Sequence, residues 1–170
     1  MSHSNWNEEI EEENFNNTLS QRTEELYRVP NTETDAEGFI EVIVLPMRDM
    51  VIFPRMVSPI FISNENALRA IQEAQTHNHT LIALTQIDPD IENPTPKDFV
   101  KTGVEIALGR LLAMPDGSSS ALAQGRRRVE IVDFIRGKQF LKVRAKVINE
   151  PATPDKKTEA TMRTVVDQFE

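Results

Sequence analysis

The sequence predicts an α+β protein built on a small, partly closed β-barrel with one inserted helix and the start of a C-terminal helical segment. Three observations predict this class. Short β-branched runs recur along residues 39–148, one helical period interrupts them, and proline or glycine separates them. Six or seven short strands around a single core are typical of a compact barrel.

Composition limits the classes of protein that are open. The 170 residues suffice for one domain with tails, and the absence of cysteine excludes disulfides and thiolate metal sites. No apolar run approaches the roughly 20 residues that span a bilayer. No basic-then-apolar signal pattern opens the chain, so we expect a cytoplasmic location without membrane contact.

The net charge of −8 is unevenly placed. Residues 1–38 hold ten acids and two arginines, whereas residues 39–170 hold 17 acids and 17 bases. Residues 1–36 have no sustained apolar period and are predicted to be a disordered acidic tail. Residues 37–152 form the β domain, and residues 153–170 begin a helical segment that we expect to continue beyond the last residue, because no stop signal follows.

The first two strands are expected around a proline-rich connection. Residues 39–45 are short and β-branched, which favours a strand that Pro46 ends. Residues 57–62 form a second strand that contains Pro59. Since proline cannot donate to a ladder, this strand lies at a sheet edge or Pro59 sits at a bulge.

A helix and a buried strand follow. Ser63 or Asn64 can cap a helix over about residues 65–76, where apolar residues recur at spacings of three and four. Residues 81–84 are continuously apolar and predict a buried strand. Residues 88–98 combine three prolines with acids and predict an exposed loop.

The second half predicts antiparallel pairing. Residues 103–114 and 118–124 flank Pro115-Asp116-Gly117, where proline presets φ and glycine accepts a positive φ, so a hairpin is expected. Gly125 is expected to break the second of these strands. Two further strands are predicted at residues 127–135 and 140–148.

The sequence contains no pattern that indicates catalysis. It lacks a GxxxxGK[ST] or GxGxxG phosphate loop and a G-x-S-x-G nucleophile turn. His77 and His79 form an H-x-H pair without a third ligand nearby, so we expect solvated histidines and not a metal site. We therefore expect no catalytic residue, cofactor or metal in this chain.

The candidate binding residues gather around the prolines of residues 45–62. Methionine is adaptable and over-used on promiscuous binding surfaces, and apolar groups beside an edge strand can accept an unfolded peptide. An alternative stays open, in which these residues only close one end of the barrel. The candidates for contacting a substrate protein are Met47, Met50, Phe53, Met56, Pro59, Phe61, Asn64, Glu65 and Asn66.

Three consecutive arginines are the sharpest charge feature. On a strand Arg127 points opposite to Arg126 and Arg128, so at most two of them share a face. Acids follow at Glu130 and Asp133. This arrangement favours intramolecular ion pairs or a solvated edge, with Arg126 and Arg128 as weaker candidates for a partner contact and nucleic acid as the least favoured partner.

Several motifs occur in the order found in one known family. Residues 45–62, L-P-M-R-D-M-V-I-F-P-R-M-V-S-P-I-F-I, closely resemble the opening motif of the Lon protease N-terminal domain. The likeness covers about residues 39–170. Its further parts are Gly103–Ala107, the Leu112–Gly117 hairpin, the Gly125–Ile131 strand and Met162–Glu170, which is similar to the start of the family's helical segment. The chain departs from the family in its long acidic leader and at residues 63–66, where relatives often carry a Gly-Arg type of turn.

The resemblance implies a PUA-like β-barrel followed by helices, acting in substrate recognition and assembly. In the family the parent is a homohexameric, ATP-dependent serine protease, endopeptidase La, that degrades misfolded and regulatory proteins. Its ATP, Mg²⁺ and Ser-Lys dyad belong to domains beyond Glu170. The implied partners are unfolded or damaged proteins and further copies of the parent. Two alternatives stay open: a free-standing LON-domain adaptor and a PUA-like nucleic-acid-binding module.

Overall fold

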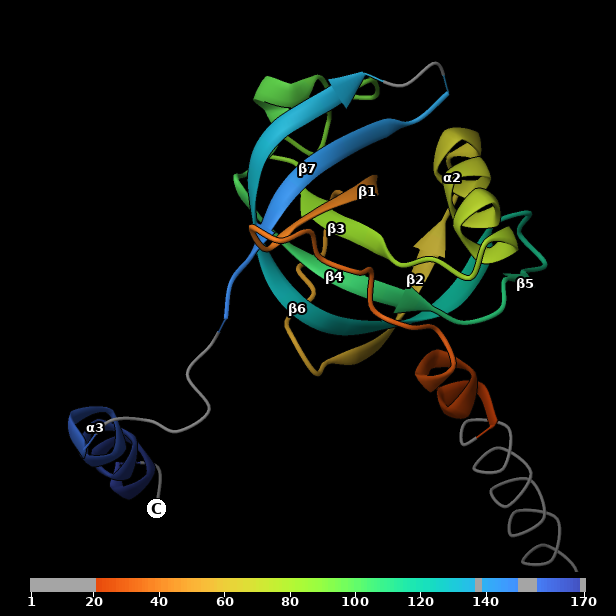
Figure 1. The fold of residues 1–170 in the computed structure, drawn as a ribbon. Helices are drawn as coiled ribbons and strands as arrows, with labels where there is room; N and C mark the ends of the chain where they lie inside the picture. The colour runs from red at the N-terminus through yellow and green to blue at the C-terminus, as the bar shows by residue number, and fades with distance from the viewer. Residues whose placement is uncertain (1–20, 137–138, 150–155, 169–170) are drawn as a thin grey trace, which may run out of the picture.

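The computed structural model describes residues 21–136, 139–149 and 156–168. Its body is a barrel in the strand order β6-β4-β3-β1-β7, which the β6–β7 pairing closes (Figure 1). The predicted α+β class, with a small barrel and one inserted helix, is confirmed. The barrel strands are β1 (Phe39–Met47), β3 (Leu81–Thr85), β4 (Thr102–Leu108), β6 (Ser119–Arg136) and β7 (Leu141–Val147).

β1 lies between β3, to which it is parallel, and β7, to which it is antiparallel. A parallel pair needs a crossover connection, and β2 (Val57–Ile62) and α2 (Glu65–Thr76) supply it. β1 runs through Pro46 to Met47, whose carbonyl accepts a hydrogen bond from the Gln86 N–H at 2.9 Å. The expectation that Pro46 ends the strand was wrong, because the parallel ladder with β3 continues past it.

The two elements of the crossover, β2 and α2, have the bounds that the sequence predicted. β2 pairs only with β6 among the described strands, so the edge position expected from Pro59 is confirmed. Asn64 caps α2, since its side-chain oxygen accepts hydrogen bonds from the N–H groups of Asn66 and Ala67 at 2.8 and 3.2 Å. The cap satisfies two N–H groups that have no partner within the helix.

Two apolar clusters hold these layers together. One fills the barrel with alternate residues of β1, β3, β6 and β7, and includes Val42, Leu84, Phe99, Val129 and Val143. The other packs α2 and β2 against the sheet, and includes Ile52, Ile60, Ile71, Leu81 and Ile106. Figure 1 shows α2 at one side of the barrel, where it contacts β1.

The predicted hairpin at residues 115–117 is present, with Gly117 at a φ of 85° and its N–H donating to Met114 O at 3.0 Å. The strand predicted at residues 103–114 ends earlier, at Leu108. The short β5 (Leu112–Ala113) follows and pairs with the start of β6.

Gly125 does not break β6, which runs through it without interruption. A Cβ atom at this position would lie 2.0 Å from the Phe53 carbonyl oxygen. The turn before β2 docks here, since the Arg55 N–H donates to Gly125 O and the Gly125 N–H donates to Met56 O. Gly125 is therefore needed for a close backbone approach within a continuous strand.

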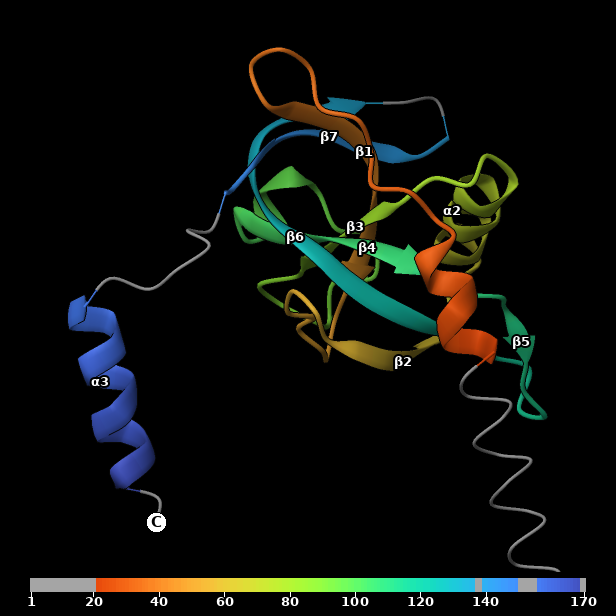
Figure 2. The same cartoon turned by 60° about the horizontal axis from the view of Figure 1, so that its bottom comes forward.

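Part of the expected disordered tail over residues 1–36 is ordered. Residues 21–27 form a helix beside β5 and the end of β4 (Figure 2), and Leu26 is fully buried. Leu26 lies against Gly109, and Glu25 pairs with Arg110. The prediction was wrong for residues 21–36; residues 1–20 lie outside the described residues.

The last described element is α3 (Lys156–Asp167), and none of its residues is buried. It confirms the helix expected near the C-terminal end of the sequence. Among the described residues, no helix combines the length and the apolar character needed to cross a membrane.

Candidate functional site

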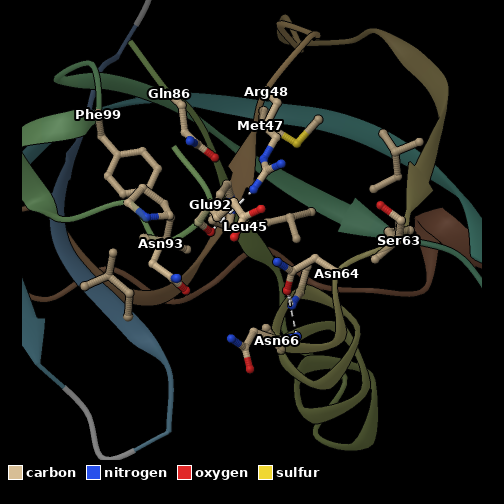
Figure 3. A pocket seen from close by; sticks show the side chains of 18 of the residues that line it. Leu45, Met47, Arg48, Ser63, Asn64, Asn66, Gln86, Glu92, Asn93 and Phe99 are labelled. Atoms are coloured by element: carbon tan, nitrogen blue, oxygen red, sulfur yellow. Dashed lines mark hydrogen bonds between the residues drawn. The ribbon is translucent and has the colours of Figure 1, made fainter. Parts of the chain in front are cut away.

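A cleft of about 580 Å³ opens between the crossover and the barrel. One wall is the end of β2 with the first turn of α2, and the other is the loop that follows β3. The end of β1 and residues 48–50 form its floor, and residues 139–141 close one side. Figure 3 shows Leu45 and Met47 between the two walls, with Ser63 and Asn64 on one side and Gln86 and Phe99 on the other.

The lower part of the cleft is apolar. Its buried members come from both apolar clusters of the fold, and Met50 and Ala67 add half-buried surface. An apolar floor favours apolar ligand groups, because their transfer out of water is the main driving force for binding of this kind. The buried apolar residues of the lining, from the floor and both walls, are Val44, Leu45, Met47, Ile60, Ile62, Ala70 and Phe99.

The rim is polar and bears charges of both signs. Arg48, Asp49 and Glu92 are exposed there, together with Asn64 and Asn66. The Arg48 guanidinium donates to the carbonyls of Ile91 and Glu92 only at 3.5 and 3.4 Å, near the limit of a hydrogen bond. The rim therefore carries no dominant charge that would select one kind of charged ligand.

Gln86 is the most unusual polar residue of the cleft. Only 4% of its surface is exposed. Its Nε2 donates to Asp88 O at 3.3 Å and Ile91 O at 3.0 Å, whereas Oε1 has no hydrogen-bond donor among the described residues. Two facing carbonyls settle the orientation of the amide, because only the NH₂ group can donate to them.

The loop that carries this wall is held by a short helix. η1 (Pro96–Asp98) begins with a capping box, in which the Thr95 N–H and hydroxyl donate to the Asp98 carboxylate at 2.7 and 2.6 Å. These two hydrogen bonds lower the pKa of Asp98, because they stabilise its charged form. The Val100 N–H then donates to Thr85 O and ties the loop back to β3.

The predicted binding residues divide between the cleft and the outer surface. Met50, Asn64 and Asn66 line the cleft, Met47 is a buried part of its floor, and Phe61 contributes from β2 with its side chain 69% exposed. The remaining predicted residues, Phe53, Met56, Pro59 and Glu65, lie outside the cleft lining. Sequence reasoning missed Gln86 and Phe99, which flank the proline-rich loop of residues 88–98, because that pattern predicted only an exposed loop.

Arg126, which was predicted with Arg128 as a weak partner contact, binds the chain itself, and so does its neighbour Arg127. Arg126 donates to the carbonyls of Leu26 and Val29, and Arg127 donates to Thr32 O at 2.8 Å. The expected alternation fails because the β4–β6 register shifts between Val104 and Ile106, so both side chains reach the same N-terminal segment. Arg128 is half-buried in β6.

Glu105 anchors the same segment from β4. Its carboxylate is fully buried and accepts hydrogen bonds from Arg127 Nε at 2.6 Å, the Thr80 hydroxyl at 2.7 Å and the Thr32 N–H at 2.7 Å. A buried charge is tolerated when it is paired and fully hydrogen-bonded. Glu105 and Arg127 are therefore structural residues, and the described residues contain no cluster of His, Cys, Asp or Glu suited to a metal ion.

A closed five-stranded barrel with an apolar cleft between its crossover and its strands has the architecture of a small binding domain. The sequence model described as "ATP-dependent protease La (LON) substrate-binding domain" matches residues 41–170. The chain belongs to this family, as the motifs of residues 45–131 predicted.

Proteins similar to this chain in sequence are named Lon protease. The chain is 33% identical over 148 residues to "Lon protease" of Endomicrobium trichonymphae, and 35% identical over 127 residues to that of Rhizobium meliloti. These matches cover 86% and 75% of this chain but only 18% and 16% of the relatives' length. The chain thus spans less than a fifth of the relatives it matches.

Solved structures show the same fold. The N-terminal domain of Mycobacterium avium complex Lon protease superposes with a TM-score of 0.58 at 24% identity, over 73% of this chain and 63% of that one. The Lon N-terminal domain protein from Xanthomonas campestris gives 0.57 at 13% identity, over 76% and 72%.

Proposed function

We propose that this chain recognises substrates for an ATP-dependent serine protease by holding apolar segments of unfolded or damaged proteins in the cleft. The observation that carries the proposal is the apolar floor beneath a mixed polar rim, in a cleft of about 580 Å³. Such a cleft fits one or two large apolar side chains, which folded proteins bury and unfolded proteins expose. The family description names a substrate-binding domain and the relatives are named Lon protease, which supports a role in binding substrates for a protease.

In this proposal the chain supplies binding, and the chemistry belongs to the rest of the protease. ATP and Mg²⁺ would act in that other part. A single shallow cleft binds weakly, but several copies in a ring-shaped assembly, such as the homohexamer of the family, would raise the overall affinity by avidity. Weak individual contacts suit a protein that must release its substrate to a protease.

The nucleic-acid alternative loses its best residues in this structure. Arg126 and Arg127 are engaged by the N-terminal segment and by Glu105, and residues 39–170 have no net charge. Nucleic-acid binding depends on cations that can reach phosphates. The adaptor alternative predicts the same cleft and differs only in the polypeptide to which the domain is joined. The cytoplasmic location remains a prediction.

Two substitutions of the same type test the proposed site. Met50→Asp places a charge in the cleft, whereas Phe53→Asp places the same charge on a neighbouring side chain outside the cleft lining that is 57% exposed. We expect Met50→Asp to weaken binding of a labelled, unfolded casein by about tenfold or more, and Phe53→Asp to leave it within about twofold. Binding is measured by fluorescence anisotropy, with circular dichroism to confirm folding.

Equal casein affinities of the unchanged protein, Met50→Asp and Phe53→Asp would contradict the proposed site. A loss caused by Phe53→Asp alone would move the site to the outer apolar surface around residues 51–57. Oligonucleotide binding with a steep salt dependence would instead favour the nucleic-acid alternative.

A further inference from the structure

The free edge of β2 carries main-chain groups that point away from the barrel. The Gly125 N–H donates to Met56 O at 2.8 Å, so the main-chain groups of Met56 face β6. In an antiparallel ladder the residues that face the partner strand alternate, so this bond determines which residues of β2 face β6. Every second residue of β2 bonds to β6 and the others direct their N–H and C=O groups outward. The outward set is Val57, Pro59 and Phe61.

Only one of these outward positions combines a donor with access to the cleft. Pro59 has no N–H, which weakens the middle of the edge as a template for strand pairing. Phe61 retains its N–H and lines the cleft, whereas Val57 is outside the lining. Among the described strands, none pairs with this edge. Phe61 is thus the outward position of β2 that also lines the cleft.

The opposite wall presents the Gln86 carbonyl oxygen. Figure 3 shows this oxygen turned toward the interior of the cleft, across from Ser63 and Asn64. It is a buried acceptor without a protein donor among the described residues. Such groups are uncommon in folded proteins, because an unmade hydrogen bond inside a protein is destabilising. Because this oxygen is buried, a ligand donor reaches it only when a neighbouring side chain moves. Arg48 also lines the cleft, is exposed and is held by long hydrogen bonds, so we expect it to move.

We propose that the cleft binds its polypeptide as an extended strand and recognises the main chain. The Phe61 N–H and C=O pair with a C=O and N–H of the ligand, and Gln86 Oε1 accepts a hydrogen bond from a ligand N–H on the other side. An extended strand presents main-chain groups alternately to its two edges, so adjacent ligand residues serve the two walls. This inference rests on the proposed function and adds the mode of recognition.

Main-chain recognition fits the chemistry of the rim. Every peptide segment offers N–H and C=O groups, so the site accepts many sequences, and the apolar floor selects segments with large apolar side chains. An extended segment also distinguishes unfolded from folded proteins, because its main chain has no internal partners. A proline at the residue facing Gln86 or Phe61 would remove the donor.

Two substitutions at one position isolate the outward N–H. Phe61→Pro removes the aromatic ring and the N–H, whereas Phe61→Val removes the ring alone. Because this N–H is not used in the β6 ladder, proline is compatible with the strand, as Pro59 already is. We expect Phe61→Pro to bind a fluorescein-labelled, unstructured peptide rich in leucine and phenylalanine about tenfold more weakly than Phe61→Val.

A ligand-side experiment holds even if Phe61→Pro does not fold. The amides of the same peptide are N-methylated one at a time and binding to the unchanged protein is measured. We expect losses of about tenfold at neighbouring amides that face the two walls, and the loss at one of them should disappear when Gln86→Met is the binding protein. A flat profile, or a profile that Gln86→Met leaves unchanged, would overturn the assignment of Gln86.

The outcomes separate this inference from the proposed function. If Phe61→Pro and Phe61→Val bind equally, main-chain pairing at β2 is refuted, while a loss in Met50→Asp keeps the cleft as the substrate site. If Met50→Asp also binds normally, the proposed site itself fails. A concentration-dependent dimer in sedimentation that Phe61→Pro dissolves would identify a second copy of the chain as the occupant and overturn the inference.

Discussion

Replacing Arg127 with methionine removes the positive partner of a buried ion pair. Glu105 is fully buried, and the Arg127 side chain is 27% exposed. Loss of one partner of a buried pair typically costs about 3–5 kcal/mol of unfolding free energy, because the other charge stays buried and unpaired. Glu105 keeps the hydrogen bonds from Thr80 and Thr32. We therefore expect the lower end, about 3 kcal/mol for Arg127→Met.

The measurement is urea denaturation followed by circular dichroism, with the melting temperature as a second readout. A loss of about 3 kcal/mol lowers the melting temperature of a domain of this size by roughly 10 °C. Arg144→Met is the matched control, because the Arg144–Asp35 pair has both side chains about 40% exposed (42% and 39%) and should contribute at most about 1 kcal/mol.

A double variant separates charge from packing. Glu105→Gln combined with Arg127→Met removes the buried charge and keeps an oxygen that can accept from the Thr32 N–H. We expect it to be more stable than Arg127→Met alone. The structural role of the ion pair would be refuted if Arg127→Met were no more destabilising than Arg144→Met, or if the double variant recovered nothing.

Three further predictions concern other parts of the fold. Gly125→Ala should lower the unfolding free energy by about 3 kcal/mol in chemical denaturation, because the new Cβ would meet the Phe53 carbonyl; an unchanged midpoint would contradict this contact. Hydrogen bonds from Ser118 lower the pKa of Asp116 in the folded protein below the ordinary value of 3.8. The Asp116 carboxylate therefore stabilises the fold above pH 3.8, and this stabilisation is lost as the pH falls through the pKa of the folded state. An NMR titration of the Asp116 carboxyl with a midpoint at or above 3.8 would refute this prediction. Arg126→Met should speed tryptic cleavage within the N-terminal helix while the barrel stays folded, because it removes two hydrogen bonds to that segment; unchanged cleavage would mean that the arginine does not hold the segment.

Local signals were sufficient where neighbouring residues decide the structure. The α2 helix follows from its apolar period and the Asn64 cap, and the hairpin follows from Pro115-Asp116-Gly117. Pro59 identified an edge strand because a missing N–H is a local property. The family resemblance then predicted the barrel, but its strand order came only from the structure.

Contacts between distant residues could not be read from local patterns. Gly125 has the pattern of a strand break, and only the docked turn at Phe53 explains why it lies inside a continuous strand. The acidic composition of residues 1–36 predicts disorder, but Leu26 is buried against Gly109, and Arg126, one hundred positions later, binds its carbonyl. Compositional arguments do not detect such pairings.

Only part of the candidate site was predicted, because the cleft also depends on contacts between distant residues. Proline and methionine around residues 45–62 indicated an apolar binding edge, and Met50, Asn64 and Asn66 do line the cleft. The pattern could not separate these residues from Phe53, which is exposed and lies outside the lining. Nor could it indicate Gln86, whose significance depends on which of its amide atoms lacks a partner.

The cleft as the substrate site is tested most directly by mapping a bound polypeptide at single-residue level. An unlabelled, apolar, unstructured peptide is titrated into the isotope-labelled chain, and amide, methyl and side-chain NH₂ signals are followed by NMR. We expect the signals of Met50, Phe61 and the Gln86 side chain to move together with one dissociation constant. The signals of Phe53 and of Val132, an exposed residue of β6 outside the cleft lining, should stay in place. Shifts confined to Phe53 and its neighbours, with Gln86 and Met50 unmoved at saturation, would contradict the cleft as the binding site.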